Sequence, residues 1–535
     1  MLSYRKLAMR VLGHPLHTGG IDSPRPASQR AAAFILTAAM LTTLAAPAFA
    51  DIWHIENGDI TISAGESGNN VTQNNNTTYG DTNTIITNQN KDTASSHTVT
   101  IEAKDKDDKV EVTLKDVNID TSSRNKAAVS VTGEGDTNIK LDGDNALKSD
   151  IYRSGIYGSG SLTISGGEND SLTAQGGSGA NGISSSGSLT ISGGTVTANG
   201  DDGCRGISSS GSVTISGGST VTANGGSGTI SGGDGIWSGG GVTISGGSTV
   251  TANGGNGGSL VGGDGIRSGG GLTVSDGTVT AKGGNGDSKD GYGGDGIRSG
   301  GVVTISGNTV NAAGGYGGKV GGYGICSFDR VAISGGTVEA AGGNGSTGGG
   351  SGIYSSVIDL SGSLELTAKA GSPNGKALSQ KGSELVLDTI KDKLGPGAKV
   401  TATDADGKVI DQVSTPRPVE PEESSSSSDG GSAAPSAPAS PLPGLTVTDK
   451  DGQRISYTST QSGNTLTVCV GRLTASFRIS LAALRQLRAE GIETIAFQTV
   501  LCSTTLSVDE LLAMGGENAE AVLTHRFTDS SLTVG

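Results

Sequence analysis

Residues 206–223 read Gly-Ile-Ser-Ser-Ser-Gly-Ser-Val-Thr-Ile-Ser-Gly-Gly-Ser-Thr-Val-Thr-Ala, and close variants of this phrase occur eight times in the chain. The copies start at glycines 24 to 31 residues apart, which are Gly155, Gly182, Gly206, Gly235, Gly265, Gly296, Gly324 and Gly352. A repeat of this length is typical of a solenoid, because one unit cannot bury its own apolar face and must stack on copies of itself. The sequence therefore predicts a rod of regular stacked coils over residues 155–374.

The pattern inside one copy predicts strands rather than helices. Apolar and small polar residues alternate with a period of two, and no copy holds a long apolar run at helical spacing. In the copy at residue 206, the residues expected to face inward are Ile207, Val213, Ile215, Val221 and Ala223. Three short strands per coil predict an all-β fold, a parallel β-helix with coils of about 28 residues, right-handed as parallel crossovers usually are.

The copies differ in length mainly at one corner. The segment between the closing alanine and the next Gly-Ile varies from 7 to 14 residues, whereas the body of the repeat is 17 or 18 residues in all copies but the first. Insertions confined to one corner project from one side of a solenoid, and that side is often the binding face.

Composition narrows the classes of partner. The chain has 93 glycines, 3% aromatic residues and a formal net charge of −15. Nucleic acid is not an expected partner, because a phosphate-binding surface needs clustered lysine and arginine. The acidity favours cations, sugars or simple solubility instead.

The N-terminal segment predicts export. An apolar run at 31–46 follows several basic residues, and Ala48-Phe49-Ala50 resembles a cleavage site, so residues 1–50 are expected to be a signal peptide. The alternative is a membrane anchor, but the run is short for a span and no other run approaches it. A secreted protein without a membrane span after signal cleavage is therefore expected.

The rest of the chain divides into three segments. Residues 51–415 are expected to be the β-helix with its terminal caps, in which the Asn-rich stretch 69–77 is interpreted as a loop and 384–393 as a short helix. Residues 416–443, rich in proline and serine, are expected to be a disordered linker. Residues 444–535 are expected to form a small α+β domain, with helices that begin at Ser480 and Ser507.

One column of acidic residues suggests a metal site. The residue before Gly-Ile is aspartate in three consecutive copies, Asp234, Asp264 and Asp295. Like charges about 5 Å apart repel by roughly 1 kcal/mol per pair in water, and bound Ca²⁺ would reverse this. Asp287 and Asp290 in the adjacent long loop are further candidate ligands. The alternative is that these aspartates sit in solvated turns, which favour aspartate before glycine.

A second column suggests sugar recognition. The residue after Gly-Ile is expected to face outward, and Trp237, Arg267 and Arg298 occupy it in successive copies. Stacking on tryptophan and pairing of arginine with carboxylates are what recognition of uronic acids requires. The alternative is tolerated variation on a surface.

Two rival functions follow from other features. A grid of outward Thr-x-Thr pairs, such as Thr249 and Thr251, is compatible with ice binding, although β-propensity alone also selects threonine there. A polysaccharide lyase would need a basic residue beside the aspartate column, for which Arg267 or Arg298 are the candidates. No catalytic constellation stands out, so a non-enzymatic role is expected.

The phrases at 112–119 and 138–149, together with the repeated Gly-Ile-x-Ser and Leu-Thr-Ile-Ser-Gly-Gly-Thr-Val-Thr-Ala, resemble those of secreted carbohydrate-binding β-helix proteins of clostridial bacteria, over about residues 90–375. The resemblance implies a pectate-lyase-like fold, calcium binding, and association with acidic plant polysaccharide rather than cleavage. The resulting hypothesis is a secreted, calcium-assisted, polysaccharide-binding rod. A structural adhesin or spacer at the bacterial surface is the main alternative, and the C-terminal domain is expected to serve attachment or partner binding.

Overall fold

The computed structural model describes residues 51–416 and most of 444–534. Within the second range it leaves out 449–453, 456, 463, 471–474, 500–502, 515–518 and 526–529. The expected signal peptide and nearly all of the expected linker lie outside the described residues. The chain separates into two compact units at residues 421 and 422, and each unit is described by itself.

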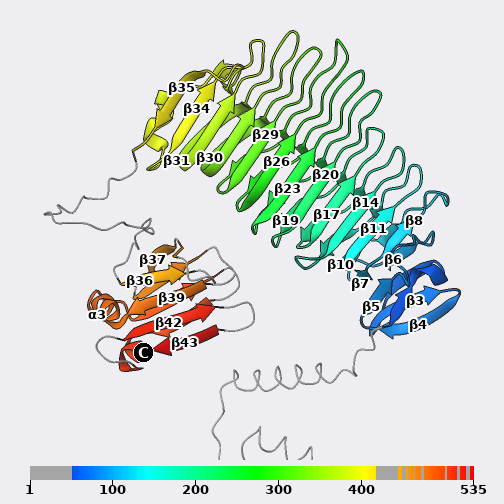
Figure 1. Cartoon of the computed structure of the whole chain (residues 1–535), viewed down its shortest axis with the longest axis horizontal. Coiled ribbons are helices and arrows are strands. Elements are labelled where there is room, and N and C mark those ends of the chain that lie inside the picture. The colour runs from blue at the N-terminus through cyan, green and yellow to red at the C-terminus, as the bar shows by residue number, and fades with distance from the viewer. Residues whose placement is uncertain are drawn as a thin grey trace, which may run out of the picture. The chain divides into compact units, whose positions relative to one another are not determined.

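Residues 51–416 form a β-solenoid of about 13 coils, in which strands about 28 residues apart pair in parallel (Figure 1). The predicted all-β parallel solenoid is therefore confirmed. Three columns of strands run along the rod, and each column is hydrogen-bonded from coil to coil.

The first column carries the Gly-Ile-x-Ser segments. It consists of β2 (Ile60–Gly65), β6 (Val99–Ala103), β9 (Val129–Gly133), β12 (Ile156–Gly158), β15 (Ile183–Ser185), β18 (Ile207–Ser209), β21 (Ile236–Ser238), β24 (Ile266–Ser268), β27 (Ile297–Ser299), the starts of β30 (Ile325–Ala341) and β31 (Ile353–Lys369), and β32 (Leu378–Gln380). In the copies from Gly182 onward, the serine that ends the repeated segment is buried, and its hydroxyl donates across the coils, as from Ser238 Oγ to the Gly211 carbonyl at 2.8 Å. The repeated serine thus connects neighbouring coils.

The second and third columns complete each coil. The second consists of β1 (Ile52–His54), β5 (Thr84–Thr87), β7 (Lys109–Lys115), β10 (Asp136–Asp142), β13 (Ser161–Ser165), β16 (Leu189–Ser192), β19 (Val213–Ser216), β22 (Val242–Ile244), β25 (Leu272–Val274), β28 (Val303–Ile305) and the middle of β30 and β31. The third consists of β8 (Asn118–Asp120), β11 (Asp144–Lys148), β14 (Ser171–Gln175), β17 (Thr195–Asn199), β20 (Thr220–Asn224), β23 (Ser248–Asn253), β26 (Gly277–Lys282), β29 (Thr309–Ala313), the ends of β30 and β31, and β34 (Lys399–Thr403).

The core is a stack of small aliphatic side chains. All five residues expected to face inward in the copy at 206 are fully buried. They stack on their equivalents, as Ile207 does between Ile183 and Ile236. Truncating one such isoleucine to alanine costs about 2–5 kcal/mol.

Caps close both ends of the solenoid, and the N-terminal cap corrects one expectation. The Asn-rich stretch is not a loop: β3 (Gly68–Gln73) and β4 (Asn76–Asp81) form an antiparallel hairpin beside β2, next to the short 3-10 helix η1 (Ile55–Asn57). Asn74 and Asn75 have φ of 53° and 64°. Asparagine tolerates this left-handed conformation, which a two-residue hairpin turn requires.

The C-terminal cap corrects a second expectation. β34 pairs with β35 (Val409–Ser414), but the helix expected at 384–393 is replaced by the two-residue strand β33 (Ser383–Glu384) and the 3-10 helix η2 (Leu387–Lys393). Glu384 cannot start a helix because its carboxylate accepts hydrogen bonds from the backbone N–H groups of Ala377 and Leu378, at 3.1 and 2.7 Å. These bonds tie it to the β32–β33 hairpin.

The variable corners stack into a second structure, here called the glycine fin, which Figure 1 shows as a row of parallel projections along one edge of the rod. It comprises residues 225–233, 254–263, 283–294, 314–322 and 342–350. Backbone hydrogen bonds of 2.8 Å run from Gly255 N–H to Gly233 and from Gly263 N–H to Gly255. The two backbone layers are so close that a Cβ at Gly263 would lie 1.9 Å from the Gly233 carbonyl oxygen. Only glycine fits this spacing.

The C-terminal unit is the expected α+β module. One sheet holds β36 (Leu445–Thr448), β39 (Ala475–Ser480), β42 (Glu520–His525) and β43 (Ser530–Val534), and the other holds β37 (Thr458–Ser462), β38 (Thr465–Cys469), β40 (Thr494–Gln498) and β41 (Ser503–Ser507). Helices α3 (Leu481–Ala489) and α4 (Val508–Met514) begin after their predicted caps. Ser480 Oγ accepts from Ala483 N–H at 3.2 Å, and Ser507 Oγ accepts from Glu510 N–H at 3.4 Å. No helix among the described residues is long and apolar enough to cross a bilayer.

Candidate functional site

One outward column of the solenoid changes its chemistry from coil to coil, and it is here called the variable face. It lies on the first strand column, where pairing aligns one outward residue per coil. These residues are Tyr157, Ser184, Ser208, Trp237, Arg267, Arg298, Cys326 and Tyr354. Trp237, Arg267 and Arg298, predicted from the sequence as sugar contacts, are therefore direct neighbours on consecutive strands.

Two arginines at this face contact aromatic rings. Arg267 and Arg298 have side chains that are 50% and 36% exposed. The guanidinium of Arg205 lies 4.3 Å from the centre of the Trp237 ring, and that of Arg298 lies 5.2 Å from the Phe328 ring. Such contacts contribute about 0.5–1 kcal/mol at exposed sites. They fix the orientation of the guanidinium groups and cover one side of the tryptophan.

Beyond Arg298 the next outward position of the variable face is covered. Cys326 occupies an outward position but is only 1% exposed, between Arg298 and Tyr354. Tyr354 stacks on Tyr323 with a centroid distance of 4.9 Å. Burial raises the pKa of the Cys326 thiol to about 12, so this thiol stays protonated at neutral pH.

The three stacked aspartates lie just below the variable face and are out of solvent. Asp234, Asp264 and Asp295 are 7%, 4% and 4% exposed. The Oδ1 of Asp234 accepts from the Asp264 backbone N–H at 2.9 Å, and the Oδ1 of Asp264 accepts from the Asp295 N–H at 2.7 Å. Asp295 continues the ladder to the Tyr323 N–H at 2.7 Å. Each aspartate therefore satisfies a buried donor of the next coil.

The second oxygen of each of these carboxylates faces an arginine. Asp234 Oδ2 lies 3.3 Å from Arg205 Nε, Asp264 Oδ2 lies 3.8 Å from Arg267, and Asp295 Oδ2 lies 3.3 Å from Arg298. Burial, together with the charges of the flanking aspartates, raises the pKa of Asp264 well above its ordinary value. Burial also raises the pKa of Asp295 to about 6. The column thus carries less negative charge than three exposed aspartates would.

The same contacts bear on the predicted calcium site. Both oxygens of the three stacked carboxylates already face hydrogen-bond donors, so an incoming Ca²⁺ would have to displace an arginine from each one. Asp287 and Asp290 are exposed on the glycine fin. Among the described residues, no three His, Cys, Asp or Glu side chains are grouped so that they could hold a metal ion. The three stacked carboxylates, paired as they are with arginines, do not form a calcium site. Calcium binding therefore remains an untested prediction from the sequence.

A cavity of about 440 Å³ opens above the aspartate column. Arg205, Arg267 and Arg298 line it together with Asp234 and Asp264. Its wall is the glycine fin, through residues that include 232, 233, 262 and 263. The cavity therefore presents three guanidinium groups beside the glycine fin, on the side where the repeat length varies.

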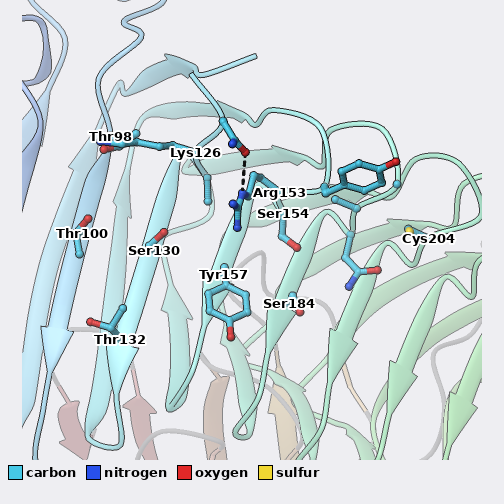
Figure 2. Close-up of a pocket in the computed structure, with 16 residues that line it drawn as sticks. Thr98, Thr100, Lys126, Ser130, Thr132, Arg153, Ser154, Tyr157, Ser184 and Cys204 are labelled. Carbon is cyan, nitrogen blue, oxygen red and sulfur yellow. Dashed lines mark hydrogen bonds between the residues drawn. The ribbon is translucent and has the colours of Figure 1, made fainter. Parts of the chain in front are cut away.

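A larger cavity of about 740 Å³ lies on the same face toward the N-terminus, over β6, β9, β12 and β15. Figure 2 shows Arg153 and Tyr157 at its centre, with hydroxyl groups of Thr98, Thr100, Ser130 and Thr132 on one side and of Ser154 and Ser184 on the other. Asn181 and Cys204 line both cavities. The two cavities are therefore adjacent along the rod.

The third strand column presents a contrasting outward surface, here called the threonine face. On β17, β20, β23 and β26 the paired residues are threonine at two positions per strand, such as Thr249 with Thr278 and Thr251 with Thr280. The next coils replace the second threonine with Asn311 and Glu339. The uniform grid expected from the sequence is thus present over four coils.

The sequence interpretation overlooked two cations. Arg205 occupies the position before Gly-Ile, where only the aspartates were considered, and Arg153 lies two residues before Gly155. Both precede a Gly-Ile segment, so an alignment of cations as well as acids at this corner would have identified them. No protein-family model, curated protein or solved structure matches this chain.

Proposed function

We propose that the variable face binds an acidic polysaccharide and does not cleave it. The observation that carries this proposal is the row of Trp237, Arg267 and Arg298 on three paired strands, beside a cavity that Arg205 also lines. The spacing between such strands is about 4.8 Å, so the row offers one contact per coil along the rod axis. A linear polymer with a regular repeat is the ligand class that this arrangement suits.

The chemistry of the row favours carboxylates. Guanidinium groups pair with carboxylates in a planar, two-pronged geometry, and an aromatic ring supplies an apolar surface for a sugar ring. The chain carries a net charge of −15, so a polyanion is repelled by most of its surface. Attraction therefore depends on these local cations, and binding is expected to weaken as salt is added.

The location and the partners of this activity are also proposals. If residues 1–50 are the expected leader, binding would take place outside the cell, and the C-terminal unit would attach the rod to cell-surface components. The proposal does not require calcium, since the three stacked aspartates are already paired with arginines. The experiment below tests whether calcium assists binding.

The direct test is calorimetric titration of the purified chain with polygalacturonate, with calcium and with a chelator. The Arg267→Ala/Arg298→Ala variant is expected to bind about 100-fold more weakly, because two charge-assisted contacts are lost. The matched control, Lys140→Ala/Lys282→Ala, removes two exposed cations from the other strand columns and should bind like the unmodified chain.

Four outcomes decide between the candidate functions. An equal loss of polygalacturonate affinity in both double variants would mean that binding depends on the net charge of the chain and not on the arginines of the variable face. Absence of binding under both calcium conditions would favour the structural spacer. Release of unsaturated products that absorb in the ultraviolet would show a lyase. Binding only with calcium, together with its loss in Asp264→Asn, would restore the predicted metal site.

A further inference from the structure

The larger cavity holds a cation that has no acidic partner. Arg153 is exposed, and its Nε donates to the Asn125 amide oxygen at 3.4 Å. No carboxylate of the described residues lies within ion-pairing distance of it. By contrast, Lys126 in the same cavity lies 2.8 Å from Asp59, and Arg205 in the neighbouring cavity lies 3.3 Å from Asp234. Unlike Arg205, Arg153 can therefore take an incoming anion without giving up an ion pair to a carboxylate of the described residues.

The surroundings of Arg153 suit a sugar ring. Tyr157, which is 43% exposed, lies at the equivalent position to Trp237 in the outward column. Figure 2 shows the guanidinium of Arg153 above this tyrosine and the hydroxyl groups of Ser130 and Ser154 beside them. Hydroxyl side chains can donate and accept hydrogen bonds to sugar hydroxyls in either direction. One aromatic surface, one free cation and a hydroxyl-lined wall thus meet in one cavity.

The two cavities lie next to each other along the first strand column. They share Asn181 and Cys204, and five steps of strand pairing lead from Tyr157 to Arg298. At about 4.8 Å per coil, this path is about 24 Å long. A short oligosaccharide covers only one of the two cavities, whereas a longer one extends into both.

We propose that the Arg153 cavity is a second subsite, which takes one carboxylate-bearing sugar unit of the same polymer that occupies the Arg267 and Arg298 subsite. This rests on the polysaccharide binding proposed above. A chain that reaches both subsites binds the second one intramolecularly, and its affinity gains from the effective concentration that the first contact provides. The face therefore selects for polymer length.

Calorimetry with oligogalacturonides of two to ten units tests this through stoichiometry as well as affinity. Short oligomers are expected to bind two per chain and weakly, whereas those long enough to span the path are expected to bind one per chain and at least about 100-fold more tightly. In Arg153→Ala, short oligomers should bind one per chain, and the gain with length should fall to about tenfold or less. Arg153→Lys, which keeps the charge, should restore two short oligomers per chain.

The controls separate this subsite from the function on which it rests. Arg153 is exposed, so the variant is expected to keep the circular dichroism spectrum of the unmodified chain, and Lys140→Ala should change neither stoichiometry nor affinity. A single short oligomer per unmodified chain, or an unchanged length dependence in Arg153→Ala, would overturn the second subsite and leave polysaccharide binding intact. Failure of oligomers of every length to bind the unmodified chain would overturn polysaccharide binding itself.

Discussion

The variable face and the threonine face lie on the same coils, yet over the four coils that contain β17, β20, β23 and β26 only the variable face changes from copy to copy. Along the threonine face, Thr249 and Thr278 are followed by Thr309 in the same register. Along the variable face, Ser208 is followed by Trp237 and then by Arg267. The inward residues behind both faces are equally buried, with Ile266 and Val279 both at 0% exposure.

The difference separates what the fold needs from what it tolerates. Because both faces cover the same aliphatic core, the substitutions on the variable face are not required for stacking. They also coincide with the glycine fin, whose segments wall the cavity beside Arg267. Side-chain variation and loop insertion at the same edge support the proposal that the variable face is the binding surface, whereas strand propensity alone accounts for the threonine face.

The largest expected effect tests the corner that carries the fin. Gly263→Val should destabilise the solenoid by more than about 4 kcal/mol or prevent folding, because backbone cannot move away from the added carbons. The matched control is Gly247→Asn at the corner before the threonine face, where φ is +72° and a Cβ meets nothing within 4 Å. Urea unfolding monitored by circular dichroism measures both variants. Equal losses of unfolding free energy would show that the two corners do not differ.

The next effect concerns charge beneath the variable face. Asp295 has a folded pKa of about 6, above its unfolded value of about 4. The protonated form is thus favoured by folding, so the contribution of Asp295 to stability is greatest below pH 4 and is lost as pH rises through about 6. Asp295→Asn keeps the oxygen that accepts from Tyr323 N–H, and should raise the unfolding free energy at pH 7 by about 1–2 kcal/mol.

Urea titrations from pH 3.5 to 7.5 test this sign. The gain in unfolding free energy of Asp295→Asn over the unmodified chain should grow as pH rises across pH 4–6, because only the unmodified chain loses the contribution of the protonated Asp295. Asp287→Asn, which removes an exposed carboxylate on the fin, is the control and should keep the original slope. A variant less stable than the unmodified chain at pH 7 would mean that the ion pair with Arg298 outweighs the cost of burial.

A smaller effect is expected from the contact between Arg205 and Trp237. A double-mutant cycle with Arg205→Ala and Trp237→Ala should give a coupling energy of about 0.5–1 kcal/mol, since the pair is partly exposed. The measurement is unfolding free energy in urea, at low and high salt. Zero coupling would mean that the guanidinium is held by Asp234 alone.

The smallest effect is expected on the threonine face. Thr280 pairs with Asn311 in the next coil, so Thr280→Asn repeats a residue that the same column already accepts. The unfolding free energy should change by less than about 0.5 kcal/mol, and polygalacturonate affinity should not change. A clear loss of polygalacturonate affinity would mean that the threonine face takes part in binding and that the two faces do not differ in function.

The periodic features of the fold could be predicted from the sequence alone. The spacing of Gly-Ile segments and the alternation around Val213 and Ile215 predicted the strands, their parallel stacking and the aligned columns, because strand geometry fixes which side each residue faces. Expectations were wrong where a local contact overrode a local preference. Glu384 is held by two backbone donors rather than starting a helix, and Asn74-Asn75 makes a hairpin turn within an apparent loop.

The repeat by itself therefore determined the rod, its core and the alignment of Trp237, Arg267 and Arg298. Only the tertiary structure decided that Asp264 is buried and bonded to the next coil, that the glycine-rich corners stack into a wall, and that Arg153 lies in a cavity where no carboxylate of the described residues pairs with it. The physical reason is that alternation specifies the direction of a side chain within its own coil. Burial and charge pairing depend on what the neighbouring coils and their loops place around it.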